Sequence, residues 1–148
     1  DEVFVEDYRA KAAELGYTVD EIITIASVLQ KEAFDDKQMP VIASVIYNRL
    51  NSSSFPFINC DSTGAYIAGF KEMLEKEGKF SDYMKVYDTY QKTGLPVGPI
   101  ACPGADAIHS ALYPESTDYY YFLHDKDGNI YLAYTASEHE NNIAKYLK

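Results

Sequence analysis

Hydrophobic residues recur at helical spacing along the chain, and the pattern is clearest in its first third. Thr18, followed three residues later by Glu21, forms the capping-box pattern that starts a helix. Apolar positions then repeat every three or four residues to about Ala33, which predicts a helix with one apolar face. After a short acidic turn, Pro40 lies in the first turn of a second predicted helix, which ends at about Leu50. We expect this helix pair to form the centre of the fold.

Shorter helices and a hairpin complete the predicted secondary structure. Residues 1–16 show helical spacing, and Gly16 ends that helix. The dipeptide Asp127-Gly128 is a hairpin turn signal between two short apolar runs, which predicts a pair of antiparallel strands. The fold class is therefore α+β, a mainly helical single domain with a C-terminal β-hairpin. Further helices are expected at residues 61–68, 71–77, 103–112 and 135–147, strands at 119–124 and 129–133, loops at 51–59 and 94–104, and either a helix or an irregular loop at 80–92.

Glu32 lies within the apolar face of the first helix of the pair, where a surface glutamate is not expected. At about 100° per residue it projects beside Val28 and Leu29, while Lys31 points to the opposite side. A carboxyl group in such a position is partly desolvated, which favours the proton-carrying form that a general acid needs near neutral pH. The alternative is that Glu32 lies at the edge of the face and reaches solvent, because charged residues are almost never fully buried.

Composition and charge narrow the classes of function. The length of 148 residues fits one domain, and the formal net charge of −10 argues against nucleic acid and anionic lipid as partners. A neutral polymer such as a glycan meets no such repulsion, and the fourteen tyrosines suit contacts with sugars or peptides as well as core packing. No stretch approaches the roughly eighteen consecutive apolar residues of a membrane span. Cys60 and Cys102 are compatible with one disulfide or with two free thiols.

Common metal and nucleotide motifs are missing from the sequence, which contains no Walker loop, GxGxxG, HExxH or CxxC. His109, His124 and His139 lie far apart without the spacing of metal ligands, so we interpret them as incidental and expect no metal site. Carboxylate chemistry remains, with Glu32 as the first candidate and Asp61, in a polar loop, as the other.

Several segments together resemble one family, and they occur in its order and at its spacing. They are ASVLQKEA (26–33), PVIASVIYNRL (40–50), CDST (60–63), YDTY (87–90), GLPVGPIACPG (94–104), AIHSALYPESTDYYYF (107–122) and SEHENNIAKYL (137–147). From about Asp20 to its end, the chain resembles the catalytic domain of the MltG/YceG-like endolytic murein transglycosylases. The membrane anchor and LysM-like domain usual in that family would precede Asp1 and are expected to be absent from this chain.

The resemblance implies a peptidoglycan lytic transglycosylase. Such an enzyme cuts the β-1,4 bond between N-acetylmuramic acid and N-acetylglucosamine without water, leaves a 1,6-anhydro end and terminates nascent glycan strands. One carboxyl group serves as acid toward the leaving oxygen and then as base toward the muramoyl C6 hydroxyl. The catalytic glutamate of the family matches Glu32. Position 30 is often glutamate in the family but is Gln30 here, so it does not compete with Glu32 for this role. No cofactor is implied, and Lys31, which points away from the apolar face, gives no support for a pyridoxal-phosphate site.

Motif matches also predict residues that bind substrate, each with a structural alternative. Asn48 and Arg49 could bind sugar, or Arg49 could fix a loop. Asp61 either steadies positive charge on the sugar or caps a helix. Tyr87 and Tyr90 either stack on sugar faces or pack in the interior. Pro96 and Gly98 are expected to shape the groove wall. The predicted substrate-binding residues are Asn48, Arg49, Asp61, Thr63, Tyr87 and Tyr90.

The chain departs from the usual pattern of the family at several motif positions. Ser62 stands where proline is usual, Asp88 where asparagine is usual, and Cys102 where asparagine precedes Pro-Gly. The resemblance places Cys60 and Cys102 in loops beside the groove, and the compartment outside the membrane permits disulfides, so a Cys60–Cys102 disulfide is predicted.

Partners and location follow from the same resemblance. Peptidoglycan glycan strands are the expected substrate, and peptidoglycan synthases are the expected partners. The expected location is the extracytoplasmic face of a bacterial membrane. Only the N-terminal anchor, which is missing from this chain, would contact that membrane. Nucleic acid is not expected. Two other functions remain open: a hydrolysing muramidase that uses Glu32 and Asp61 and leaves reducing ends, and a peptidoglycan-binding module without catalysis.

Overall fold

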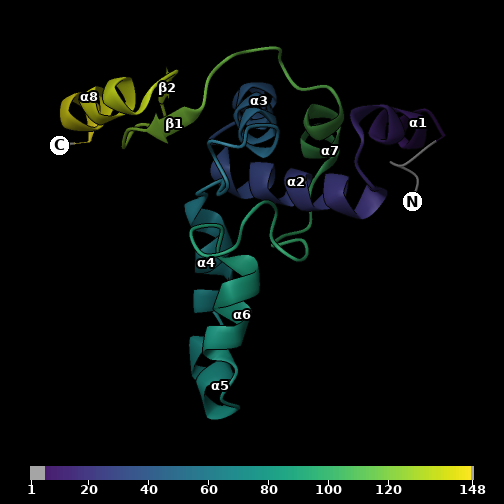
Figure 1. Ribbon diagram of the computed structural model, residues 1–148, viewed down its shortest axis with the longest axis vertical. Helices are drawn as coiled ribbons and strands as arrows, with labels where there is room; N and C mark the ends of the chain where they lie inside the picture. The colour runs from purple at the N-terminus through teal and green to yellow at the C-terminus, as the bar shows by residue number, and fades with distance from the viewer. Residues whose placement is uncertain (1–5, 148) are drawn as a thin grey trace.

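Helices make up most of the structure, a computed structural model that describes residues 6–147 (Figure 1). The helices are α1 (Glu6–Leu15), α2 (Val19–Glu32), the 3-10 turn η1 (Asp36–Gln38), α3 (Met39–Leu50), α4 (Asp61–Ala68), α5 (Lys71–Lys76), α6 (Phe80–Tyr87), α7 (Ala105–Leu112) and α8 (Ala136–Tyr146). The strands β1 (Tyr121–His124) and β2 (Ile130–Ala133) pair antiparallel, with Phe122 opposite Leu132. The predicted α+β class is confirmed, and the part of the first predicted helix at residues 1–5 lies outside the described residues.

Helix α2 is central and packs against α1, α3, α4 and α7 (Figure 1). The predicted capping box is present, since the Thr18 side chain accepts a hydrogen bond from the Glu21 N–H and the Glu21 carboxylate accepts one from the Thr18 N–H. Its apolar face is fully buried at Ile22, Ile25 and Leu29. Burial of this face against α3 and α7 forms the core and fixes the direction in which the end of α2 points.

Side chains of α3 hold the chain that leads into the hairpin. Asn48 donates hydrogen bonds to the Thr117 and Tyr119 carbonyls at 2.9 and 2.8 Å, and Arg49 donates to the Tyr120 carbonyl at 2.6 Å. These contacts occupy carbonyls that a longer strand would need for pairing, which explains why β1 begins at Tyr121 rather than at the predicted residue 119.

Three short helices, α4, α5 and α6, form an arm that extends away from α2, with α5 at its far end (Figure 1). Residues 80–92, predicted as either a helix or an irregular loop, form a helix from Phe80 to Tyr87. Helix α7 starts at Ala105, two residues after the predicted start, because the backbone of Gly104 is extended and forms the N-cap; its N–H donates to the Gln30 side chain at 2.9 Å. No helix among residues 6–147 combines the length and apolar character that crossing a membrane requires.

Candidate active site

Glu32 is the last residue of α2 and lies half-buried at a cavity of about 530 Å³. Six parts of the chain build this cavity: the end of α2, the end of α3, the turn that leads into α4, the turn after α6, the hairpin, and α8. The polar residues that line it include Glu32, Arg49, Asp61, Tyr90, His124 and His139. The cavity thus brings together the two predicted acids and two of the other predicted substrate-binding residues.

The two oxygens of the Glu32 carboxyl group have different surroundings. Oε2 accepts a hydrogen bond from the Ser62 N–H at 3.0 Å. This N–H belongs to the first turn of α4, where the unpaired amides carry partial positive charge. Serine has this N–H to donate, whereas a proline at the same position would not. Oε1, by contrast, has no hydrogen-bond partner within residues 6–147.

A pair of buried threonines fixes the turn that presents the Ser62 amide. Thr63 and Thr89 are both fully buried. Thr63 Oγ1 donates to the Cys60 carbonyl at 2.7 Å and accepts the Thr89 N–H at 2.9 Å, while Thr89 Oγ1 accepts the Cys60 N–H at 2.9 Å. The predicted role of Thr63 in binding substrate does not fit this burial; its hydroxyl instead joins the start of α4 to the turn after α6.

Asp61 and Tyr90 form a hydrogen-bonded pair at the edge of the cavity. The Tyr90 hydroxyl donates to Asp61 Oδ1 at 2.7 Å, and both side chains are exposed. Partial desolvation and the hydrogen bond to Asp61 raise the pKa of Tyr90, so this hydroxyl remains a donor at neutral pH. Asp61 is the first residue of α4, and the expectation that it caps the helix is wrong because Cys60 occupies the cap position and no side chain caps this helix.

Arg49 is buried and holds the cavity wall together. Its Nη1 donates to the Phe57 carbonyl at 3.0 Å, and its guanidinium lies 4.8 Å from the Tyr121 ring and 4.9 Å from the Phe55 ring. Together with its bond to the Tyr120 carbonyl, these contacts favour the loop-fixing alternative for Arg49. Asn48, whose amide is engaged with two carbonyls, lies outside this cavity.

Two histidines interpreted as incidental line the same cavity as Glu32. His124 Nε2 lies 2.7 Å from the Gln38 Oε1, and Gln38 also donates to the Gly128 carbonyl at 2.8 Å, which ties the hairpin to η1. Burial lowers the pKa of His124 although the negative charge of Glu32 opposes this. His139 stacks on Tyr121 with ring centroids 4.9 Å apart, and burial followed by the charge of Arg49 lowers its pKa.

Tyr87 and the two cysteines do not line the Glu32 cavity. Tyr87 packs against Tyr66 on the arm with ring centroids 5.5 Å apart, in agreement with the packing alternative. The predicted disulfide is wrong for this structure, since Cys60 and Cys102 are free thiols. Cys60 faces the interior at the start of α4, where burial raises the pKa of its thiol, whereas Cys102 lies exposed on the loop before α7.

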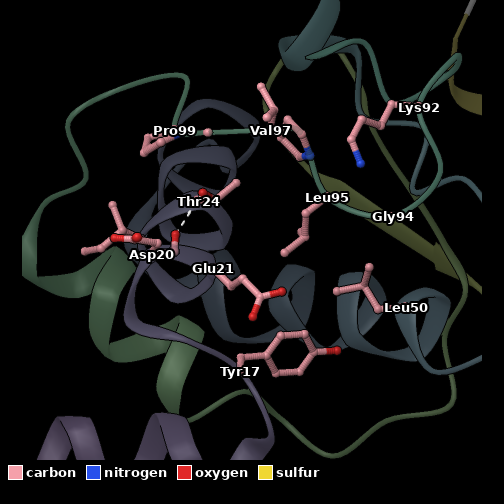
Figure 2. A pocket seen from close by; sticks show the side chains of 13 residues that line it. Tyr17, Asp20, Glu21, Thr24, Leu50, Lys92, Gly94, Leu95, Val97 and Pro99 are labelled. Atoms are coloured by element: carbon pink, nitrogen blue, oxygen red, sulfur yellow. Dashed lines mark hydrogen bonds between the residues drawn. The ribbon is translucent and has the colours of Figure 1, made fainter. Parts of the chain in front are cut away.

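The Gly- and Pro-rich loop lines a second cavity of about 620 Å³ over the first half of α2 (Figure 2). Figure 2 shows the side chains of Glu21 and Leu95 pointing into the space near Tyr17 and Leu50. Pro96 and Gly98, expected in the groove wall, belong to this second cavity and not to that of Glu32. The loop continues along α2, where the Ile100 N–H donates to Ser27 Oγ at 3.0 Å.

A mainly helical domain with a half-buried glutamate at a tyrosine-lined cavity defines a candidate acid–base enzyme. Residues 1–145 match the sequence model of the YceG-like family, and the chain belongs to that family. It is 35% identical over 144 residues to the endolytic murein transglycosylase of Bacillus subtilis (strain 168), a match that covers 97% of this chain and 39% of that protein. The corresponding protein of Streptococcus pneumoniae serotype 2 (strain D39) is 31% identical over 147 residues, covering 95% of this chain and 26% of that protein.

The fold is also similar to that of a solved relative. A YceG-like protein from Listeria monocytogenes superposes with a TM-score of 0.75 at 33% sequence identity, over 91% of this chain and 43% of that one. The chain therefore spans well under half the length of these relatives. These comparisons confirm the family inferred from the sequence motifs.

Proposed function

We propose that the chain is the catalytic domain of a lytic transglycosylase that cuts murein glycan strands internally, with Glu32 as its single acid and base. The observation that carries this proposal is the asymmetry of the Glu32 carboxyl group, with Oε2 held by the Ser62 amide and Oε1 free at the cavity. The names of the two curated relatives support murein as the substrate.

In the first step, Glu32 donates its proton from Oε1 to the glycosidic oxygen, and the bond from this oxygen to the muramoyl anomeric carbon breaks. The N-acetylglucosamine side leaves as an alcohol, and positive charge develops on the muramoyl ring. Glu32 is then a carboxylate, and the Ser62 N–H stabilises the negative charge that has appeared on it.

In the second step, the Glu32 carboxylate removes the proton of the muramoyl C6 hydroxyl while that oxygen bonds to the anomeric carbon. The product is a 1,6-anhydro end, and Glu32 regains the proton that it lost. Attack within one sugar ring needs no bound water and benefits from proximity. Asp61, held by Tyr90 at the cavity edge, supports the positive charge of the ring by its own negative charge.

A hydrolysing muramidase is the second candidate, because Asp61 lines the same cavity as Glu32 and a pair of carboxyl groups is what glycoside hydrolysis usually requires. The hydrogen bond from Tyr90 occupies one Asp61 oxygen and favours a supporting role over attack on the sugar. We place the reaction at the extracytoplasmic face of the membrane, where murein lies, in a longer membrane-anchored protein that terminates nascent strands beside peptidoglycan synthases.

The identity of the new chain end tests this function. Uncrosslinked glycan strands are incubated with the protein, and the products are analysed by mass spectrometry with and without prior borohydride reduction. The proposal predicts 1,6-anhydro ends, which borohydride leaves unchanged. Reducing ends would establish the muramidase instead, and strands that are bound but not cut would establish a binding module.

A further inference from the structure

A third cavity lies on the other side of the contact between Glu32 and Ser62. It has a volume of about 700 Å³ and is built by α2, α4 and the loop before α7. Lys31 and Ser62 line it, and each is the chain neighbour of a residue that lines the Glu32 cavity, namely Glu32 and Asp61. The Glu32–Ser62 hydrogen bond therefore separates two cavities, as expected of a groove in which a polymer extends to both sides of the acid.

The chemistry of the third cavity suits an anionic ligand with some apolar surface. Lys31 is exposed there and forms no ion pair with any residue in the described range. Ala65 and Tyr66 offer apolar surface, and the buried Ser62 hydroxyl has no hydrogen-bond partner among residues 6–147. A protein with a net charge of −10 repels anions in general, so an unpaired lysine beside the acid provides a local exception.

We propose that this cavity holds the stem peptide of the muramoyl residue next to the scissile bond, with the Lys31 ammonium group bound to a peptide carboxylate. The inference rests on the proposed function for its substrate. The glycan backbone of murein is neutral, whereas the peptide on its lactyl group carries carboxylates, so the peptide is the part of the strand that a cation recognises. This contact makes the enzyme selective for strands that carry acidic peptides.

Cys102 provides a direct reporter, because it is an exposed thiol that lines this cavity, whereas Cys60 is buried. In the Glu32→Gln variant, which prevents turnover, the rate of Cys102 alkylation by iodoacetamide is followed by peptide mapping. The ligands are a GlcNAc–MurNAc tetrasaccharide that carries tetrapeptides with free carboxylates and the same compound with these carboxylates amidated. At tenfold excess over its Kd, the acidic ligand should slow alkylation about tenfold, and the amidated ligand at the same concentration should slow it far less.

Lysine variants complete the test. Lys31→Gln should remove the difference between the two ligands, while Lys92→Gln, in the cavity over the first half of α2, should preserve it. Equal slowing by both ligands in the presence of Lys31, a difference between the ligands that survives Lys31→Gln, or no slowing by either ligand would overturn the proposal. Wild-type cleavage is assayed alongside: anhydro ends without protection of Cys102 refute the peptide site alone, and protection without anhydro ends refutes only the proposed function.

Discussion

At the scale of the residue, the position of Glu32 on the apolar face of its helix was predictable, but its detailed surroundings were not. The helical spacing placed its side chain on the apolar face of α2, and the structure finds it half-buried at a cavity. The hydrogen bond from the Ser62 N–H joins positions that are 30 residues apart, and no local pattern indicates such a contact. The resemblance to the family implied that serine stands where proline is usual, and only a residue other than proline can donate this N–H.

Replacing Ser62 by proline removes the donor to Glu32 with little effect on the helix, because proline is accepted in a first helical turn. The carboxylate that Glu32 becomes after it donates its proton then loses a hydrogen bond. We expect Ser62→Pro to slow strand cleavage about fivefold, the effect of losing a hydrogen bond of about 1 kcal/mol.

Ser62→Ala is the matched control, since alanine keeps the N–H and removes only the hydroxyl, and its cleavage rate should stay close to that of the wild type. Equal slowing in both variants, or slowing in neither, would show that the Ser62 amide does not act on Glu32.

At the scale of the element, helices and the hairpin followed from local patterns, whereas their mutual placement did not. The capping box of α2, the proline in the first turn of α3 and the Asp127-Gly128 turn are all present as predicted. The histidines escaped detection because His124 reaches the cavity only when the hairpin folds onto η1 through Gln38. Such contacts depend on packing between elements far apart in the chain, for which spacing carries no signal.

Gly128 provides a test of how the hairpin is attached. Its φ is +87°, and a Cβ atom there would overlap the Phe34 ring. Gly16 has a similar φ of +84° but open space around it. We expect Gly16→Ala to cost about 1 kcal/mol of unfolding free energy from backbone strain alone, and Gly128→Ala to cost about 1–2 kcal/mol more.

Denaturant unfolding measures both variants, and Phe34→Ala in the Gly128→Ala background should recover most of the difference. Equal costs at the two glycines, or no recovery, would mean that Phe34 does not pack on the turn.

At the scale of the whole molecule, two partly buried histidines couple stability to pH. Burial lowers the pKa of His124 and of His139 below 6.5, so between the lowered value and 6.5 the unfolded chain binds more protons than the folded one. The stability from these groups is complete above about pH 7 and is lost as the pH falls through their folded pKa values. We expect Tm to fall between pH 7 and pH 5.

Thermal unfolding across this range checks the sign. The double variant His124→Gln/His139→Gln should show a smaller fall in Tm, whereas His109→Gln, which changes an exposed histidine, should follow the wild type. A Tm that rises toward pH 5, or an unchanged slope in the double variant, would contradict the assignment.

The most direct test of the account is the rate and product of strand cleavage by Glu32→Gln and Asp61→Asn measured side by side. If one carboxyl group is both acid and base, Glu32→Gln should lose cleavage by about a thousandfold or more, while Asp61→Asn should be slower by about tenfold and still give 1,6-anhydro ends. Substantial cleavage by Glu32→Gln, or an equal loss in both variants with reducing ends from the wild type, would contradict it.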